Sequence, residues 1–368
     1  MADVADAILA NSIRHKLGLL RLENSIVRRI IALLNRSDRD LLGKIVDAVD
    51  RGASVDSVRR LKAIRAELKM VNNEAYVTAS RGLSAVLKDL SVREVDWSAG
   101  MIEREVPIAF SMTRPSRHLL TALVVSNPFQ GALLRDHMAK LAGNRLSALT
   151  NDLEIGLVEG ESISQLMARV RGTRRNKYRD GILHNVGRRQ LETIVRSAAQ
   201  HTTETARELL IQENDDIIDG TMWVNTLDHR TCRVCQPRGG LVWSWSSDNG
   251  YQPDGHSLPW NNGPGRIHFQ CRCTAIPVLK GFDELAKKAG VDLSSIGPQE
   301  RSALNRPVPV NMDYEEWLRG ESKEIQILAL GARRAELFRN DQGTLDEIWA
   351  RRFLPNIAGF ATLDEIFP

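Results

Sequence analysis

Hydrophobic residues recur at three- and four-residue steps through most of the first 220 residues. In the first such stretch they are Leu19, Leu22, Ile26, Ile30, Leu33 and Leu34, with Arg28, Arg29 and Arg36 between them. This spacing predicts an amphipathic helix, whose apolar face is typical of a helix packed inside a bundle. We expect further helices after it, with breaks near residues 96–100 and at Asn127-Pro128.

Two more helices are predicted before residue 220. Ser162 and Gln165 have the spacing of a capping box, and Leu166, Met167 and Val170 follow as an apolar stripe, so a helix should begin after Gly160. A longer helix is expected over about residues 188–212, because apolar residues from Leu191 to Leu210 fall on one side of it.

The pattern changes after Asp219-Gly220. Residues 221–227 and 241–245 alternate as strands do, and Pro237, Gly239 and Gly240 predict a turn between them. Residues 248–266 are rich in Gly, Pro, Asn and Asp, which predicts a long irregular loop. Loops of this length are usually functional or held by a ligand.

Helical patterning returns after Pro277, and a Pro-containing linker at residues 306–310 precedes helices at about 314–318 and 323–338. We therefore predict a mainly α protein that carries a small α+β module resembling a zinc knuckle, with long helices leading into a short β-hairpin. Three domains are expected: a helical N-terminal region, a central domain with the knuckle at 221–280, and a helical tail, spanning 1–150, 151–280 and 281–368.

Composition is that of a soluble globular protein. Of 368 residues, 42% are hydrophobic, 26% charged and 5% aromatic, which excludes disordered and collagen-like chains. The net charge of +4 is too small to identify a partner. The N-terminus lacks the pattern of a secretory signal, and apolar runs such as 119–125 are far shorter than the ~20 residues that cross a bilayer. We expect no membrane association and folding in a cytosol.

The strongest chemical signal is a cluster of sulfur ligands. All four cysteines lie in one window, as Cys232 and Cys235 and then, after a long gap, Cys271 and Cys273, with His268 beside the second pair. Zinc takes four thiolate or imidazole ligands in a tetrahedron, and a Cys-x-x-Cys turn supplies two of them. The pattern predicts a structural Zn²⁺ site made by the four cysteines, with His268 as an alternate ligand or a group behind the ligands.

Two alternatives remain for these residues: reduced structural thiols, or a redox pair at Cys232 and Cys235. A site closed by four protein ligands leaves no position for water or substrate, so we expect no catalysis at it. Trp243 and Trp245 share one face of their strand and are expected to cover the metal knuckle as a local core. His229 and His256 are interpreted as loop residues.

A basic stretch precedes the long second helix. Its members are Arg169, Arg171, Arg174, Arg175, Lys177, Arg179, Arg188 and Arg189, with Asp180 as the one acid. Such a run can neutralise several phosphates or face an acidic protein surface, and it is also typical of a solvated connection between helices. Aromatic residues are limited to Tyr178, so sequence-specific base contacts are not expected.

The order of these signals resembles the bacteriophage Mu F-like head morphogenesis family over about residues 150–280. The resemblance rests on Gly160-Glu161-Ser162, on Asp228 through Cys235, on Gly239-Gly240 and on His268 through Cys273. Two positions depart from the family pattern: Ser197-Ala198 follows the helix arginine, Arg196, where a Thr-Glu pair is common, and Phe269 follows the motif histidine where a proline is common.

The resemblance implies a minor capsid protein of the virion, assembled in the bacterial cytoplasm and placed inside the phage head or at the portal vertex. It would act in head morphogenesis, DNA packaging or DNA delivery. Partners would be the portal, major capsid or scaffold protein and double-stranded DNA without sequence preference; no small-molecule substrate and no enzymatic activity are expected. Two alternatives are a metal-dependent DNA nuclease that uses Asp228, His229, His256 or His268, and a zinc-containing transcription regulator.

Overall fold

The computed structural model describes residues 2–51, 57–106, 111–279, 300–302, 307–309, 312–340 and 343–350. The chain forms two compact units. The first comprises Met1–Val224 and Leu241–Gly297, and the second comprises Asn225–Gly240 and Pro298–Pro368.

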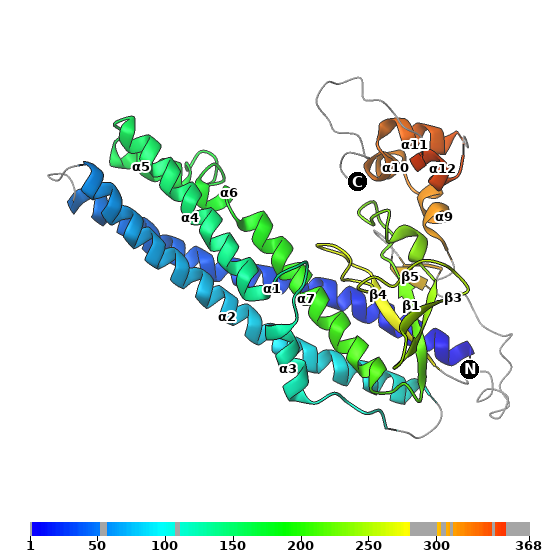
Figure 1. The fold of residues 1–368 in the computed structure, drawn as a ribbon. Coiled ribbons are helices and arrows are strands. Elements are labelled where there is room, and N and C mark those ends of the chain that lie inside the picture. The colour runs from blue at the N-terminus through cyan, green and yellow to red at the C-terminus, as the bar shows by residue number, and fades with distance from the viewer. Residues whose placement is uncertain are drawn as a thin grey trace. The chain divides into compact units, whose positions relative to one another are not determined.

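Long helices form the body of the first unit. Helix α1 (Ala2–Arg51) and helix α2 (Ser57–Glu105) run antiparallel side by side (Figure 1). Helices α4 (Leu134–Val158) and α7 (Arg188–Gln212) pack against α2. Most of the apolar stripe predicted from the sequence lies in their shared core, although Leu22 is 42% exposed. That core includes Ile26, Ile30, Leu34, Leu83, Leu87, Met138 and Val195.

The predicted break at residues 96–100 is wrong. Helix α2 continues through them because Val95 and Ala99 are buried on its inner face, and the Ser98 hydroxyl donates to the Glu94 carboxylate. Burial therefore outweighs the weak helix propensity of Asp96, Ser98 and Gly100.

The other helix boundaries agree with the local signals. Helix α3 (Arg117–Ser126) ends before Asn127-Pro128, as the proline requires. Helix α5 (Ile163–Arg171) begins with the predicted capping box, in which Ser162 and Gln165 satisfy each other's backbone amides. A short helix α6 (Ile182–Asn185) precedes α7. Leu166, Val170 and Leu183 then join α1, α2 and α4 in a second apolar core.

A four-stranded antiparallel sheet completes the first unit. Its strands, in the spatial order β3-β2-β1-β4, are β1 (Ile218–Val224), β2 (Val242–Ser246), β3 (Gly250–Asp254) and β4 (Thr274–Leu279). Trp223 and Trp243 are fully buried on it, with ring centroids 5.5 Å apart, which confirms the core role predicted for Trp243. The protein is thus mainly helical with a small antiparallel sheet.

Two of these strands differ from the sequence prediction. Strand β3 lies inside the predicted loop, and β4 follows Cys273 directly. Pro253 and Pro277 interrupt the strand pattern, although both sit on edge strands of the sheet, where a missing N–H is tolerated.

The second unit is built from short elements. They are the 3₁₀ turn Gln236–Arg238, strands β5 (Glu300–Ser302) and β6 (Pro307–Pro309), and helices α9 (Tyr314–Arg319), α10 (Lys323–Leu330), α11 (Ala332–Arg339) and α12 (Leu345–Ala350). Trp317, Phe338, Ile348 and Leu227 share its core. The helix predicted over 323–338 is two helices, because Gly331 has a φ of 79°. Between Leu279 and Tyr314 the structure describes only 300–302, 307–309 and 312–313. The first two segments are the paired strands β5 and β6, where the sequence predicted helical patterning and a linker.

No helix in the described parts of the chain is both long and apolar enough to cross a membrane.

Candidate metal centre and basic loop

The Cys-x-x-Cys sequence forms a tight turn in the second unit. The carbonyl of Cys232 accepts the backbone N–H groups of Cys235 (3.0 Å) and Gln236 (3.0 Å). The Cys235 N–H also lies 3.4 Å from the Cys232 Sγ. An amide that donates to sulfur stabilises a thiolate, which is the form of cysteine that binds a metal.

Polar side chains around the turn hold its shape. Asn225 donates from Nδ2 to the carbonyl oxygens of Cys235 (3.1 Å) and Gln236 (3.2 Å). Asp228 is buried and accepts the Arg230 N–H at 2.9 Å, and the Gln236 side chain donates to the Thr231 carbonyl at 2.8 Å. The turn is therefore fixed by residues before and after the cysteines.

The second cysteine pair forms a turn in the first unit. The Cys271 N–H donates to the His268 carbonyl at 3.2 Å, and both Cys271 and Cys273 are buried. Gln270, which lies between His268 and Cys271, has a φ of 58°. Its N–H donates to the Ser197 hydroxyl of α7 at 2.8 Å. Helix α7 thus fixes the position of this turn.

Glu204 of α7 accepts hydrogen bonds from the residues that follow Cys273. Its carboxylate accepts the Thr274 hydroxyl (2.8 Å) and the Ala275 N–H (3.0 Å). Gln200, one turn earlier, donates both to this carboxylate (2.9 Å) and to the Cys273 carbonyl (3.1 Å). Two side chains of α7 therefore position the buried cysteine turn.

Glu204 belongs to a buried network of charges. Arg207 pairs with Glu204 and with Glu94 of α2, and Lys16 of α1 lies 3.5 Å from Glu204. Burial opposes ionisation of Glu94, but Arg207 and His15 outweigh it and lower its pKa to about 2. The network joins three helices to strand β4.

The glutamate of this network was missed in the sequence. No motif of the sequence analysis includes Glu204, which lies farther along α7 than Arg196-Ser197-Ala198. Its charge on the buried side of an amphipathic helix was the available signal, since a buried carboxylate requires a partner.

The cysteine and histidine side chains form groups that could hold a metal ion. Their members are the predicted ligands: Cys232, Cys235, Cys271, Cys273 and His268. No disulfide joins any of the cysteines, all of which lie in the described residues. Thiolate and imidazole ligands fit a soft or borderline ion such as Zn²⁺ rather than Mg²⁺ or Ca²⁺.

His256 has both ring nitrogens engaged with the β-hairpin. Its Nε2 lies 2.7 Å from the Val242 carbonyl, and its Nδ1 accepts the Leu258 N–H at 3.2 Å. Both ring nitrogens thus hold the loop that follows β3. His268, in contrast, uses Nδ1 on the Phe269 carbonyl at 2.8 Å.

The basic stretch divides into paired and outward-facing residues. Arg169 bonds the carboxylates of Glu161 and Glu159, and the Arg188 guanidinium donates to Asn35 at 2.6 Å. Between α5 and α6, Asp180 accepts the Thr173 N–H (2.8 Å) and Asn176 side chain (2.8 Å). The Thr173 hydroxyl also donates to Asp180, and this bond lowers the pKa of Asp180 the most, followed by the bonds from Asn176 and the Thr173 N–H. We name residues 173–180 the basic loop.

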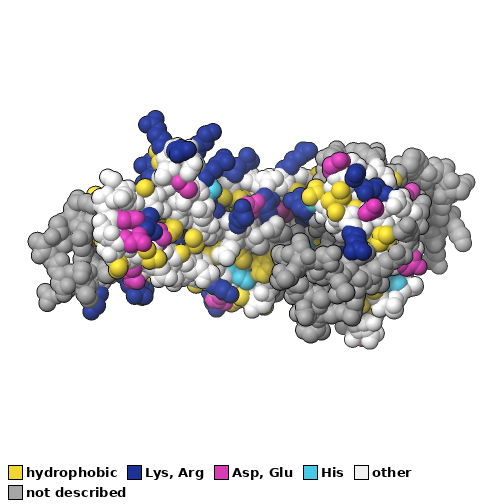
Figure 2. Space-filling model, turned by 90° about the horizontal axis from the view of Figure 1, so that it is seen from above, with side chains coloured by type: hydrophobic (Ala, Val, Ile, Leu, Met, Phe, Trp, Pro, Cys, Tyr) yellow, Lys and Arg dark blue, Asp and Glu magenta, His cyan; other side chains and the backbone are white. Residues whose placement is uncertain are grey.

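The cations of the basic loop face solvent. Arg174, Arg175, Lys177 and Arg179 are all exposed. Arg171 lies at the end of α5 with its guanidinium carbon 4.4 Å from the centre of the Tyr178 ring. Figure 2 shows Lys and Arg side chains gathered along the side of the first unit that carries α5 and α6. The fold thus presents four cations on a loop shaped by one aspartate.

Residues 147–276 match the family model described as Phage Mu protein F like protein. This confirms the resemblance inferred from the cysteine motifs, over a segment that runs from α4 to β4 and contains the basic loop and all four cysteines. Comparisons with curated proteins and with solved structures found no match.

Proposed function

We propose, from the Mu F-like match over residues 147–276, that this protein is a minor component of a phage head that acts without catalysis in head morphogenesis. Its place would be the virion, inside the head or at the portal vertex. The portal, major capsid or scaffold protein would be its partners.

We propose further that Cys232, Cys235, Cys271 and Cys273 bind one structural Zn²⁺. The support is the donor set, the absence of disulfides among the described cysteines, and the two turns that hydrogen bonds hold in shape. Four cysteines complete a tetrahedral site and leave His268 as the substitute ligand. The metal would stabilise the fold, since zinc binding contributes about 10–16 kcal/mol in small zinc modules.

Purified heads test the proposed place of the protein. Heads from infected cells should contain the chain in fewer copies than the major capsid protein, and cross-linking should join it to the portal, scaffold or capsid protein. A chain that is abundant in the lysate and missing from both precursor and mature heads would contradict the proposal.

The basic loop is proposed to contact double-stranded DNA through phosphates. With four cations engaged, the affinity for a 30-bp duplex of random sequence should fall ~100-fold between 50 and 200 mM salt. Replacing Arg174, Arg175, Lys177 and Arg179 with Ser should remove most of that salt dependence. The matched control replaces exposed cations of α2, Arg81 and Arg93, and should change little.

Two outcomes speak against DNA as the partner. If DNA affinity and its salt dependence do not change when the four cations of the basic loop are replaced, the DNA contact lies elsewhere on the protein. Unchanged DNA affinity together with loss of a cross-link to an acidic head protein would assign the loop to a protein partner instead.

A further inference from the structure

Helix α1 carries a row of apolar and basic side chains on the side that faces away from α7. The members of the row follow one another at alternating steps of four and three residues: Leu22, Ile26, Arg29, Leu33 and Arg36. Asn24 and Asn35, which accept from Arg196 and Arg188 of α7, lie on the opposite side of the helix. Alternating steps of four and three are the spacing with which one helix meets another in a coiled coil.

A groove of about 270 Å³ lies beside this row, between α1 and α2. Its floor is apolar, with Ile26 and Ile30 buried and Leu33 and Val86 half-buried. Gly82 of α2 keeps the groove open, because even a Cβ at this position would lie 3.4 Å from the Leu33 side chain. Pockets that hold a whole small molecule measure about 300–1,000 Å³, so this groove suits the side chains of a partner.

Two cations stand at the rim of the groove. Arg29 and Arg36 are exposed, and within the described ranges neither side chain has an ion pair or a hydrogen bond. They are seven residues apart, which is about 10.5 Å along a helix. Asp40 and Asp89 do not line the groove, and Asp89 pairs with Arg93. The rim is therefore positive and lacks a counterion.

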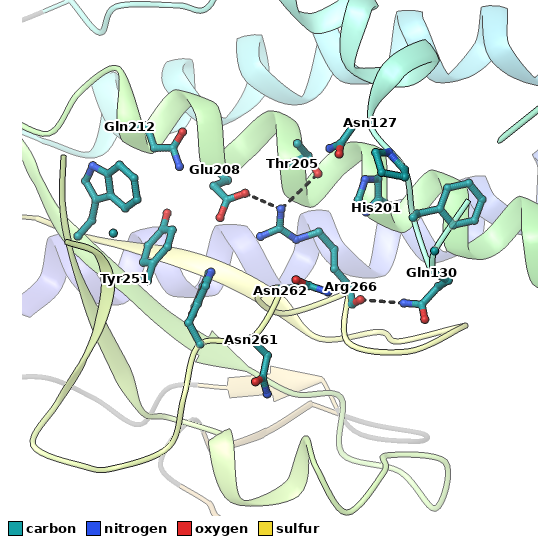
Figure 3. A pocket seen from close by; sticks show the side chains of 16 residues that line it. Asn127, Gln130, His201, Thr205, Glu208, Gln212, Tyr251, Asn261, Asn262 and Arg266 are labelled. Atoms are coloured by element: carbon teal, nitrogen blue, oxygen red, sulfur yellow. Dashed lines mark hydrogen bonds and ion pairs between the residues drawn. The ribbon is translucent and has the colours of Figure 1, made fainter. Parts of the chain in front are cut away.

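Arg266 of the same unit shows the opposite arrangement. Figure 3 shows it in a cavity of about 880 Å³ between α7 and the sheet, where it pairs with Glu208 and donates to the Thr205 hydroxyl at 3.3 Å. Gln130 donates to the Arg266 carbonyl at 2.8 Å. The charges of that cavity are thus used within the protein, whereas the two cations of the α1–α2 groove remain for a partner.

Three properties of the groove define its occupant. The spacing of the row on α1 fits a helix, the floor fits Leu, Ile or Val side chains, and the rim fits Asp or Glu. Duplex DNA fits only the rim, because a phosphate backbone has no apolar side chain to cover the floor. An acidic amphipathic helix fits all three properties.

We propose that the groove between α1 and α2 binds an amphipathic helix of another protein. Its apolar side chains would cover the floor, and acidic side chains seven residues apart would pair with Arg29 and Arg36. This surface goes beyond the proposed head function. It depends neither on the metal nor on the family match, because α1 and α2 precede the matched residues 147–276.

Fluorescence anisotropy of labelled peptides with the full chain tests the proposal. The acidic peptide has three heptads with Leu at positions a and d and Glu at e and g. The basic peptide has Lys in place of Glu, and the scrambled peptide has the acidic composition without the heptad order. The acidic peptide should bind at least about tenfold more tightly than the other two. Equal binding of the acidic and scrambled peptides, tighter binding of the basic peptide, or no binding would overturn the proposal.

Charge reversal locates the contact. Arg29→Glu combined with Arg36→Glu should reverse the preference, so that the basic peptide binds more tightly than the acidic one. The control combines Arg65→Glu with Lys69→Glu, two exposed residues of α2 at least about 20 Å along the helix from Gly82, and should bind as the wild type does. Equal losses in both double variants would contradict binding in the groove.

A pair of substitutions at Gly82 separates filling of the groove from loss of the fold. Gly82→Met should weaken the acidic peptide about tenfold by filling the groove, whereas Gly82→Ala should change its affinity by less than about twofold. Both replace glycine with a better helix former, so thermal melts should show each variant folded. Wild-type affinity in Gly82→Met would place the contact elsewhere.

Sedimentation of the full chain without peptide tests a second copy as the occupant. We expect the same mass for the wild type and for the Arg29→Glu, Arg36→Glu variant. A wild-type dimer that this variant separates into monomers would mean that a second copy covers the groove, and would overturn the proposal.

Discussion

Glu204 shows how one side chain connects the helices to the cysteine turn. It accepts from Thr274 and Ala275 directly after Cys273, and it faces Arg207 and Lys16 in a buried site. Its partners come from α1, α7 and β4, far apart in the sequence. A helical wheel predicts that such a residue is buried, but the tertiary fold alone supplies its partners, so this role was out of reach of sequence analysis.

Glu204→Gln should destabilise the first unit by about 3 kcal/mol, because it leaves two buried cations with one carboxylate fewer. Calorimetric unfolding measures the loss, and faster hydrogen exchange at the Ala275 amide would locate it. Glu192→Gln on the same helix is the control. Glu192 is 42% exposed, so this change should alter the free energy of unfolding by less than ~0.5 kcal/mol. Equal effects of the two changes would contradict the proposed anchoring role.

Glu23 on α1 gives stability a predictable pH dependence. Burial raises its pKa from 4.5 to about 7, although Lys16, Arg196 and Arg272 oppose this. The folded protein holds the proton more tightly than the unfolded chain. This contribution to stability is therefore complete below pH 4.5 and is lost as the pH rises through 7.

Glu23→Gln removes that titration. At pH 8 the variant should be more stable than the wild type by roughly 3 kcal/mol, and near pH 4 the two should be similar. Urea unfolding at a series of pH values measures the difference, with the exposed Asp40→Asn as the control on the same helix. Parallel stability curves for Glu23→Gln and the wild type would refute the assignment.

At the scale of elements, the sequence predicted those whose signals are local. The capping box of α5, the stop before Pro128 and the span of α7 depend on neighbouring residues, and the structure confirms all three. Strands β3 and β4 were missed because each contains a proline, and β4 in addition pairs with β1, which lies far earlier in the sequence.

The basic loop should depend on Asp180 for its shape. Asp180→Ala removes the acceptor of the Thr173 and Asn176 groups, so the loop should loosen while α5 and α7 remain. Limited trypsin digestion should then cut faster at Arg174, Arg175, Lys177 and Arg179. Asp219→Ala, an exposed acid outside the loop, is the control. Cleavage at the wild-type rate in Asp180→Ala would mean that other contacts shape the loop.

For the whole molecule, the family resemblance and the metal proposal both concern the segment between α4 and β4. The cysteine motifs made the segment recognisable, because thiol spacing is local and zinc chemistry restricts it. The N-terminal helices carried no such motif, and their cores could be predicted only as apolar stripes. The cross-linking experiments above therefore have to test what these helices contact.

The cysteine turns should loosen when the metal is removed. Chelation, or Cys235→Ser, should speed hydrogen exchange in the Cys232 and Cys271 turns, whereas the amides of α1 and α2 should keep their protection, since apolar burial stabilises those helices. Unfolding of the helices at the same chelator concentration would contradict a local structural role.

The central claim is that the four cysteines hold one structural zinc ion, and the metal content of the purified full chain tests it most directly. Elemental analysis should find about one zinc per wild-type chain and nearly none in Cys235→Ser, with Cys232→Ser alike. A wild-type protein that is folded and free of zinc, or a Cys235→Ser protein that retains the full equivalent, would contradict the claim.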